Sequence, residues 1–313
     1  MKIAILCNSV LPLASIQMLA SNGLVACVGM PAEDNPETPE IVAFLAAMQL
    51  SLTRFNKNGL EDSLQRWLNK NNADVVFVMT FPWKIPGKVL SQPKLGFFNF
   101  HYALLPKYRG ASPVFWQLYN GEAYGGLTIH KMDQGFDTGP IAHIHKIAIR
   151  EGETYGIHNK RLAWETVQGV GTFTQTLMLL GNAVPLTPQG SDEAQYFNRP
   201  TAKDLAIDWA TMSAKQIQYL VNACNPWNKG AFARFGNIVF KIIQASVKEH
   251  PGVYNQQLIP GSVINCSEKK TIDIISVDNN ILSIEVISVD EGIFTADFLV
   301  KLGLKKDMVL LNL

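Results

Sequence analysis

The stretch Phe98-Asn99-Phe100-His101-Tyr102-Ala103-Leu104-Leu105-Pro106-Lys107-Tyr108-Arg109-Gly110 changes from an apolar strand pattern to a loop within a few residues. Side chains alternate between the two faces of a strand, so Asn99 and His101 are expected to project from the same face. Further along, Gly135-Phe136-Asp137-Thr138-Gly139 places a carboxylate between two glycines after another strand-like run. An amide, an imidazole and a carboxylate at strand ends can polarise a carbonyl group and move protons. The sequence therefore predicts a catalytic site at Asn99, His101 and Asp137.

The residues around this stretch alternate between strand and helix patterns. Four apolar runs are too short for helices and continuous enough for buried parallel strands, namely residues 2–7, 24–30, 75–79 and 97–100. Between the first two runs, Pro12 suits a helix start and Gly23 a helix stop. This alternation predicts an α/β domain with a doubly wound, mostly parallel sheet. The first strand-to-helix turn lacks G-x-G-x-x-G, so a nicotinamide dinucleotide is not expected.

The second half of the chain shows one long helix, a linker and then a β-rich region. Apolar residues from Trp164 to Leu180 recur every three or four positions, and Gly181 is placed to end that helix. Residues 186–204 are rich in helix breakers and lack periodicity, as a linker does. Ser213 and Gln216 form a capping box for a short helix, and the alternating runs beyond it predict a small β-barrel or sandwich. We therefore predict a catalytic domain over residues 1–185, the linker, and a C-terminal domain over 205–313.

The composition is that of an ordinary soluble globular chain of 313 residues, with 17% charged residues and a net charge of +1. Its longest apolar runs are far short of a membrane span, and its first residues read as a strand and not as a signal peptide. The four cysteines lack the spacing of a zinc site or redox pair, so free thiols, a cytoplasmic location and no metal are expected.

These motifs resemble those of the folate-dependent formyltransferases, which carry Asn-x-His followed by Leu-Leu-Pro and, later, Asp-x-Gly. The resemblance covers nearly the whole chain, because Ile207-Asp208-Trp209, Asn225-Pro226-Trp227 and Pro260-Gly261-Ser262-Val263-Ile264 follow the order of the C-terminal domain of methionyl-tRNA formyltransferases. It implies an OB-like barrel for the C-terminal domain and 10-formyltetrahydrofolate as the formyl donor. The function expected is N-formyl transfer to a primary amine.

Each catalytic candidate has a role in this chemistry. Asn99 is expected to donate an N–H to the oxyanion that forms on the formyl group, and His101 to share that role or to exchange a proton with the amine. Asp137 is expected to fix the tautomer of His101, raise its pKa and accept the proton of the amine through a water. Taken singly, each residue also suits an ordinary turn, and only their combination favours catalysis.

The resemblance also implies where the folate binds. In the family, the pterin lies between main-chain groups and apolar side chains, at positions that correspond here to Thr80, Phe81, Pro82, Trp83, Ile85 and Leu104. The family commonly has a smaller Ala-Tyr-Gly-like stretch at this place, and Pro82 cannot donate an N–H.

The identity of the amine is the open question. In the tRNA enzyme, the loop after the second strand is long and basic, whereas residues 31–40 hold Glu33, Asp34, Glu37 and Glu40 and no base. Acids at this place repel phosphates, and no Lys or Arg between Lys2 and Arg54 offsets them, which favours a small amine such as an amino-sugar nucleotide or a carrier-bound amino acid. The alternatives are an authentic methionyl-tRNA formyltransferase of translation initiation, a formyltetrahydrofolate hydrolase, and a non-catalytic binding module. Whether the C-terminal domain binds RNA stays open, as does the oligomeric state.

Overall fold

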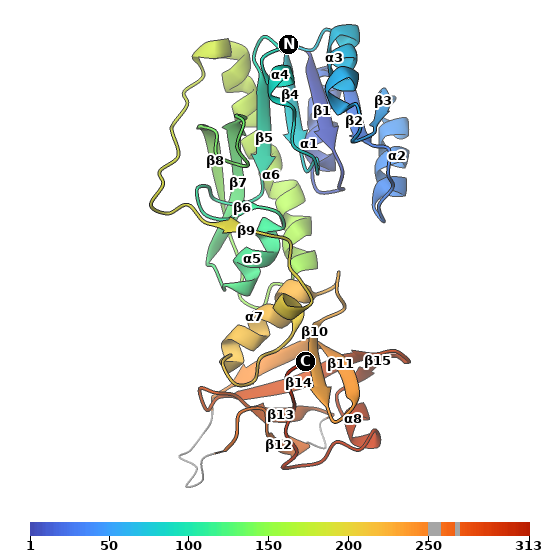
Figure 1. Cartoon of the computed structure of the whole chain (residues 1–313), viewed down its shortest axis with the longest axis vertical. Helices are drawn as coiled ribbons and strands as arrows, with labels where there is room; N and C mark the ends of the chain where they lie inside the picture. The colour runs from blue at the N-terminus through green and yellow to red at the C-terminus, as the bar shows by residue number, and fades with distance from the viewer. Residues whose placement is uncertain (250–257, 267–269) are drawn as a thin grey trace. The chain divides into compact units, whose positions relative to one another are not determined.

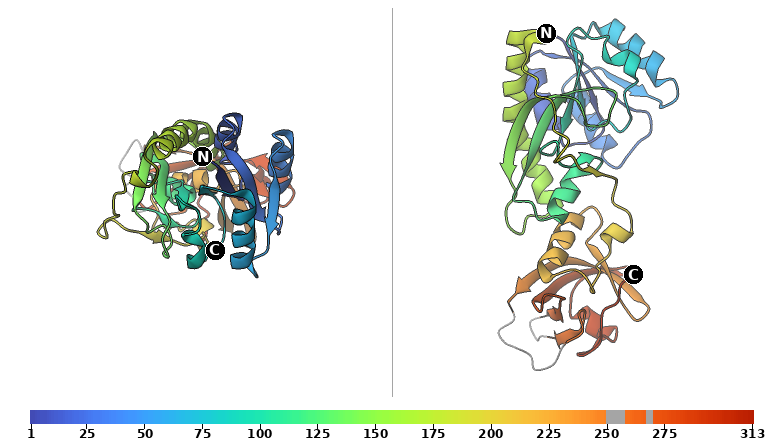
Figure 2. Two further views of the ribbon diagram at one scale, coloured as in Figure 1. Left: turned by 90° about the horizontal axis from the view of Figure 1, so that it is seen from above. Right: turned by 60° about the vertical axis from the view of Figure 1, so that its left-hand side comes forward.

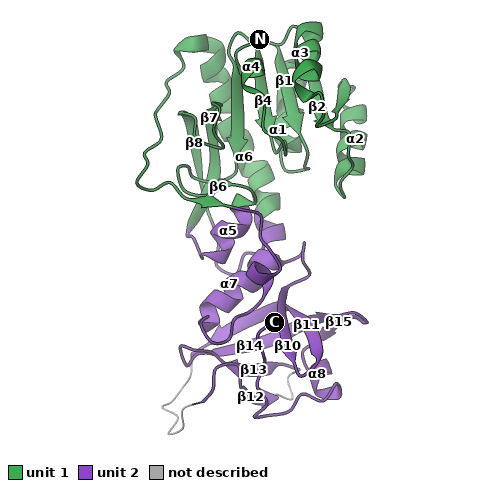
Figure 3. Cartoon of the chain, viewed as in Figure 1, with its two compact units in different colours: residues 1–113, 124–148, 159–197 green, residues 114–123, 149–158, 198–313 purple. Residues whose placement is uncertain are grey.

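The computed structural model describes residues 1–249, 258–266 and 270–313. The chain forms two compact units that interleave along the sequence (Figure 3). Unit 1 contains Met1–Pro113, Tyr124–Ala148 and Asn159–Phe197, and unit 2 contains Val114–Ala123, Ile149–His158 and Asn198–Leu313. The predicted division into a catalytic domain, a linker and a C-terminal domain at residues 185 and 204 stays a prediction.

Unit 1 is built on a seven-stranded sheet with the order β3-β2-β1-β4-β5-β7-β8 (Figure 1). Its strands are β1 (Ile3–Cys7), β2 (Val25–Pro31), β3 (Leu52–Phe55), β4 (Val75–Met79), β5 (Phe97–His101), β7 (Tyr124–Lys131) and β8 (Ile141–Ala148). Neighbours from β3 to β5 are parallel, and β7 is antiparallel to both β5 and β8. The predicted doubly wound, mostly parallel sheet is confirmed. Winding reverses between β1 and β4, and open α/β sheets bind ligands at such a switch point.

Helices cover both faces of this sheet (Figures 1 and 2). On one face, the Phe173 ring of α6 (Tyr155–Leu180) lies 4.9 Å from the Phe98 ring and 5.8 Å from the Phe77 ring between centroids. On the other face, α3 (Leu60–Asn71) and α4 (Gly87–Leu90) close a core with apolar side chains of β1, β4 and β5. The remaining helices up to the end of α6 are α1 (Leu13–Ser21), α2 (Thr38–Ala47) and α5 (Pro113–Tyr119).

The long helix is where predicted, but its buried face is not the predicted stripe. Val170, Phe173 and Leu177 are buried, whereas Trp164 is 71% exposed and Leu180 is 47% exposed. Trp164 lies nine residues before Phe173, and at 3.6 residues per turn this places the two side chains on opposite sides of the helix. The inclusion of Trp164 in the apolar stripe was therefore wrong.

Unit 2 contains an antiparallel sheet with the order β10-β11-β14-β13-β12, and β15 pairs with β14. Its strands are β10 (Ala231–Phe235), β11 (Ile238–Lys248), β12 (Val263–Cys266), β13 (Ile272–Ile275), β14 (Ile281–Val289) and β15 (Gly292–Thr295). The C-terminal segment bonds to both ends of this order, since Leu311 N donates to the Arg234 carbonyl and Val263 N donates to the Met308 carbonyl. The predicted C-terminal β domain is confirmed. Its C-terminal segment forms one isolated bridge beside β10, at Arg234, and one beside β12, at Ser262.

The other elements of the chain are short. Helix α7 (Ala214–Cys224) begins with the predicted capping box between Ser213 and Gln216. The others are β6 (Arg109–Gly110), β9 (Tyr196–Phe197), η1 (Gly181–Ala183), η2 (Lys203–Leu205) and α8 (Phe298–Lys301). In the part of the chain that the structure describes, no helix has the length and hydrophobicity to cross a membrane.

Candidate active site

The three predicted catalytic residues meet at the carboxyl end of β5. Asn99 and His101 lie on this strand, and Asp137 lies on the loop between β7 and β8. The Asn99 Nδ2 donates to Asp137 Oδ1 at 2.9 Å, and His101 Nδ1 lies 3.7 Å from Asp137 Oδ2. The structure therefore brings together the amide, the imidazole and the carboxylate that the sequence predicted, in contact or near contact.

The loop that carries Asp137 is closed by its own residues. Asp133 Oδ1 accepts from Gly135 N at 2.9 Å and from the Thr138 hydroxyl at 2.7 Å. A Cβ on Gly139 would lie 1.8 Å from the Lys131 carbonyl oxygen, so only glycine allows this close approach of two backbones. Asp137 itself has φ +55°, a left-handed conformation that Asp adopts more readily than most residues.

His101 is almost completely buried and has a defined tautomer. Its side chain is 6% exposed, and Nε2 lies 2.7 Å from the Tyr108 carbonyl oxygen. A carbonyl oxygen only accepts, so Nε2 carries the hydrogen, and Nδ1 of the neutral ring has its lone pair available near Asp137. Burial lowers the pKa of His101, although the charge of Asp137 opposes this. The ring is therefore neutral at pH 7.

Asp137 is an anion in this setting. Burial by itself would raise the pKa of its carboxyl group, but the charge of His101, the hydrogen bond from His130 and the Gly110 N–H together lower it well below the ordinary value. Gly110 N donates to Asp137 Oδ2 at 2.9 Å. The site at neutral pH thus combines a neutral imidazole with a carboxylate.

The structure places a further histidine, His130, inside the cluster. His130 lies opposite Asn99 in the pairing of β5 with β7 and is 2% exposed. Its Nε2 is 3.1 Å from Asn99 Nδ2 and 3.5 Å from Asp137 Oδ1. The signal that would have found it is the strand register, which the sequence alone does not give.

Gln189 is a second residue of this site that no sequence pattern indicated. It falls in the predicted linker, yet its side chain contacts the loop of Asp137 and the side chain of Arg109. A segment rich in breakers and without periodicity gives no sign of such contacts.

The residues predicted for folate lie at neighbouring strand ends. Thr80 follows β4 directly, has φ +70°, and its hydroxyl accepts from Asn8 N at 3.2 Å, after β1. Phe81 and Trp83 pack partly buried against the core, and Pro82 is exposed. The Lys84 Nζ lies 5.3 Å from the centroid of the Phe136 ring, next to Asp137. This segment and the loop that carries Asp137 are therefore side by side.

Two of the predicted folate residues are less available than the others. Ile85 is 2% exposed and belongs to the core beneath α3 and α4. Leu104 is half-buried, between the Ala103 carbonyl and the Leu105 N–H, which both bond to the Thr128 hydroxyl. A folate contact at position 85 would therefore use the backbone and not the side chain.

The acidic loop after β2 has a basic partner on β3. Arg54 on β3 forms an ion pair with Asp34 and also donates to the Ala32 carbonyl. In the pairing of β2 with β3, Arg54 lies opposite Met30, so it reaches the start of this loop even though it is distant in sequence. The prediction that no Lys or Arg offsets the four acids was therefore wrong for Asp34.

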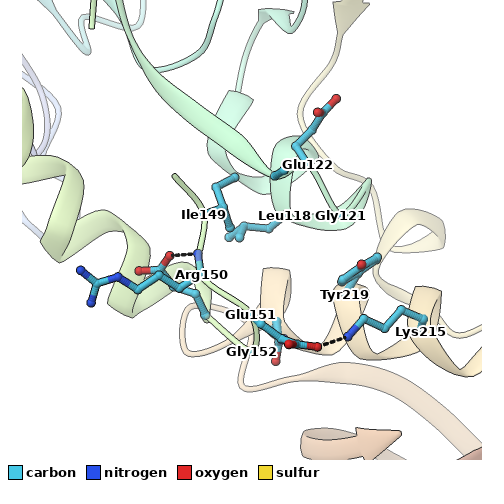
Figure 4. Close-up of a pocket in the computed structure, with 12 residues that line it drawn as sticks. Leu118, Gly121, Glu122, Ile149, Arg150, Glu151, Gly152, Lys215 and Tyr219 are labelled. Carbon is cyan, nitrogen blue, oxygen red and sulfur yellow. Dashed lines mark hydrogen bonds and ion pairs between the residues drawn. The ribbon is translucent and has the colours of Figure 1, made fainter. Parts of the chain in front are cut away.

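A pocket of about 230 Å³ lies in unit 2, between the end of α5, the segment around Gly152, and α7 (Figure 4). Glu151 and Lys215 form an ion pair at 2.9 Å on its wall. The residues that line this pocket belong to unit 2, whereas Asn99, His101 and Asp137 belong to unit 1. Across residues 1–249, 258–266 and 270–313, no group of three His, Cys, Asp or Glu is placed to hold a metal ion.

Two protein families match the chain, "Formyl transferase" over residues 29–172 and "Formyl transferase, C-terminal domain" over residues 200–294. A methionyl-tRNA formyltransferase from Pelotomaculum thermopropionicum is 34% identical over 261 residues, which cover 81% of this chain and 80% of that protein. Another, from Agathobacter rectalis, is 34% identical over 182 residues, covering 58% of this chain and 57% of that protein. The crystal structure of WlaRD, a sugar 3N-formyl transferase, with dTDP and 5-N-formyl-THF, has the same fold, with a TM-score of 0.67 at 18% identity over 91% of this chain and 97% of that one.

Proposed function

Because this chain belongs to the folate-dependent formyltransferase family, we propose that it moves the formyl group of 10-formyltetrahydrofolate to a primary amine. The contact of Asn99 and His101 with Asp137 at the carboxyl end of β5 is the observation that carries this proposal. These residues supply a hydrogen-bond donor, a proton acceptor and an anion within one small site.

The reaction places one demand on each residue. The amine nitrogen bonds to the formyl carbon, the bond from that carbon to the folate nitrogen breaks, and one proton passes from the amine to the folate nitrogen. Asn99 is the donor for the oxyanion on the formyl group, and a single donor of this kind is typically worth about 10²–10³ in rate. Asn99 Nδ2 lies within hydrogen-bond distance of both Asp137 and His130. The oxyanion therefore replaces one of these two groups as the hydrogen-bond acceptor of Asn99.

His101 and Asp137 manage the proton. The Nδ1 lone pair of neutral His101 accepts the proton of the attacking amine, since Nε2 is already committed to the Tyr108 carbonyl. The imidazolium that results faces Asp137 Oδ2 at 3.7 Å, and the opposite charge stabilises it until the proton passes to the leaving nitrogen.

The folate is expected beside this cluster. Thr80, Phe81, Pro82 and Trp83 offer backbone and aromatic surface at the end of β4, which is the neighbour of β5. Leu104 follows β5 and adds a half-buried apolar side chain, and Ile85 supports the segment from the core. This arrangement suits a flat heterocycle with donors and acceptors on its edge.

We assign a small amine as the acceptor, in preference to tRNA. Glu33, Asp34, Glu37 and Glu40 are all exposed, and Arg54 offsets only Asp34. A surface that grips a tRNA backbone needs bases in place of these acids. The sugar 3N-formyl transferase of the same fold shows that this scaffold serves acceptors of that size in another protein.

The test is an acceptor panel with 10-formyltetrahydrofolate, in which tetrahydrofolate and formylated product are both measured. The panel contains methionyl-tRNA, amino-sugar nucleotides, an aminoacyl carrier protein and a sample without acceptor. We expect tetrahydrofolate to form in equal amount to a formylated small amine. Tetrahydrofolate formed at the same rate without any acceptor would identify a hydrolase instead.

The second candidate is a methionyl-tRNA formyltransferase. The similarity to proteins of that name along most of the chain favours it. Rapid formylation of methionyl-tRNA in the panel, with binding that weakens steeply as salt rises, would replace the small-amine assignment.

A further inference from the structure

The part of unit 1 that follows η1, residues 184–197, runs along the proposed active site. Thr187 exchanges two backbone hydrogen bonds with Ile141 at the start of β8, at 2.7 and 2.8 Å. Further on, β9 pairs in parallel with β6, and the Phe197 ring stacks on the Tyr108 ring at 5.1 Å. Tyr108 is the residue whose carbonyl accepts from His101. The segment therefore touches the loops that carry the catalytic groups.

Gln189 makes the most direct of these contacts. Its Nε2 donates to the Asp137 carbonyl at 2.8 Å and to the Gly139 carbonyl at 2.7 Å. Its Oε1 accepts from Arg109 Nε at 3.1 Å and from Arg109 Nη2 at 2.7 Å. One half-buried amide thus uses its donors on the loop of Asp137 and its oxygen on the strand β6.

Both sets of hydrogen bonds made by the Gln189 amide, to the Asp137 loop and to Arg109, lie next to atoms of the proposed catalytic site. Asp137 holds a left-handed backbone conformation at φ +55°, which few residues keep without support. Arg109 precedes Gly110, whose N–H donates to the Asp137 carboxylate. A Cβ on Gly110 would lie 2.3 Å from the Phe197 carbonyl oxygen, so the backbone of Phe197 packs closely against Gly110. Gln189 therefore holds the backbone of Asp137 with its Nε2. With its Oε1 it holds Arg109, which precedes the Gly110 N–H that donates to the Asp137 carboxylate.

We propose that Gln189 is a positioning residue for formyl transfer, which holds the backbone of Asp137 so that its carboxylate stays in contact with Asn99 and Gly110 and faces His101. This inference rests on the proposed function. It gives residues 184–197 of unit 1 a role in the chemistry, beyond that of the predicted linker.

Two substitutions distinguish the hydrogen bonds that Gln189 donates to the Asp137 loop from those that it accepts from Arg109. Gln189→Leu keeps the approximate size of the side chain and removes every hydrogen bond. Gln189→Glu keeps an oxygen for Arg109 but replaces the donor Nε2 by an oxygen, which faces the carbonyl groups of Asp137 and Gly139. Ser191→Ala is the matched control, because the Ser191 hydroxyl bonds only locally to Asp192 and both residues are exposed.

The first measurement is steady-state kinetics with the full chain. We expect both Gln189 variants to lower kcat by about 10- to 100-fold, as displacements of around 1 Å do, with the KM for 10-formyltetrahydrofolate within about 3-fold of the wild type. Ser191→Ala should match the wild type. A kcat within about 2-fold of the wild type in both Gln189 variants overturns the proposal; should Gln189→Leu fail to fold, Gln189→Glu decides alone.

The second measurement does not need turnover. Asp137 and His130 are the titratable groups that face His101, and the charge of Asp137 opposes the effect of burial on the imidazole. Displacing Asp137 should therefore move the NMR titration of His101, assigned with His101→Gln, to lower pH in Gln189→Leu, which adds no charge of its own. An unchanged titration contradicts the positioning role. If the wild type formylates no amine, the proposed function fails, while this titration still decides whether Gln189 positions Asp137.

Discussion

The protonation state of His101 controls the proposed chemistry at the scale of a single residue. The ring accepts the proton of the amine only while it is neutral, and burial lowers its pKa from the ordinary value of 6.5. The Tyr108 carbonyl fixes the hydrogen on Nε2 and so leaves the Nδ1 lone pair for the proposed proton transfer. Burial and one backbone hydrogen bond together therefore prepare a proton acceptor.

This predicts the shape of the pH profile. Because the pKa of His101 lies below its ordinary value of 6.5, the ring is mostly neutral at pH 7 and above, and kcat should stay level there as far as this group is concerned. As the pH falls through the lowered pKa, His101 takes up a proton and kcat should decrease. The measurement is kcat between pH 5 and pH 8 with saturating substrates, and a rising limb centred above pH 7 would contradict it.

The sequence predicted part of this site because three of its residues follow strand patterns or turn motifs. Asn99 and His101 share a face of one strand, and Asp137 stands in a glycine-bounded turn. His130 depends on the register between β5 and β7, which local patterns do not determine. Gln189 depends on contacts across 52 positions of the chain to Asp137, which no local pattern encodes.

Among the elements, the turn between β7 and β8 is the most constrained. The backbone at Gly139 passes so close to Lys131 that an added Cβ would overlap its carbonyl oxygen at 1.8 Å. A glycine is therefore needed at position 139 for space. Its carbonyl also accepts a hydrogen bond from Gln189, so a displaced backbone here would disturb that contact.

Gly139→Ala is therefore expected to destabilise the protein by about 1–3 kcal/mol, as overpacking does, and to lower kcat by displacing Asp137. Urea unfolding measures the first effect. Gly190→Ala is the matched control in the connecting segment, because a Cβ there meets nothing within 4 Å, and its unfolding midpoint should be that of the wild type. Equal midpoints for both variants would contradict the close approach.

Elements with continuous apolar runs were predictable, and half-exposed ones were not. Strands β1 and β4 are buried along their whole length, which is why an unbroken apolar run identified them. The edge strand β3 has only one buried residue, Phe55, and a short run with Thr53 and Arg54 carries no strand signal. Trp164 follows the helix period closely enough to mislead, because periodicity alone does not tell which side of a helix meets the sheet.

For the whole molecule, charge is the property that bears on the acceptor. The net charge is +1, and the loop after β2 is acidic. Two of its acids also have structural partners: Asp34 pairs with Arg54, and Glu37 accepts from Val10 N at 2.9 Å. Glu33 and Glu40 are exposed and can be exchanged with less disturbance of these contacts.

The double variant Glu33→Lys, Glu40→Lys should bind tRNA more tightly than the wild type at low salt, because four units of charge change on one surface. Turnover of a small amine should not change. Binding is measured at several salt concentrations, with Glu33→Gln, Glu40→Gln as the control that removes the charge without reversing it. Equal tRNA affinity of all three proteins would show that this loop does not meet the nucleic acid.

The most direct test of the central claim is the turnover of Asp137→Asn with 10-formyltetrahydrofolate and the best amine from the panel. This change keeps the size of the side chain and removes the charge that faces His101. We predict that kcat falls by about 100-fold or more while the affinity for the folate stays within about 3-fold of the wild type, since the carboxylate acts in the transition state. A variant that turns over at the wild-type rate, or that loses folate binding and turnover in equal measure, would contradict the account.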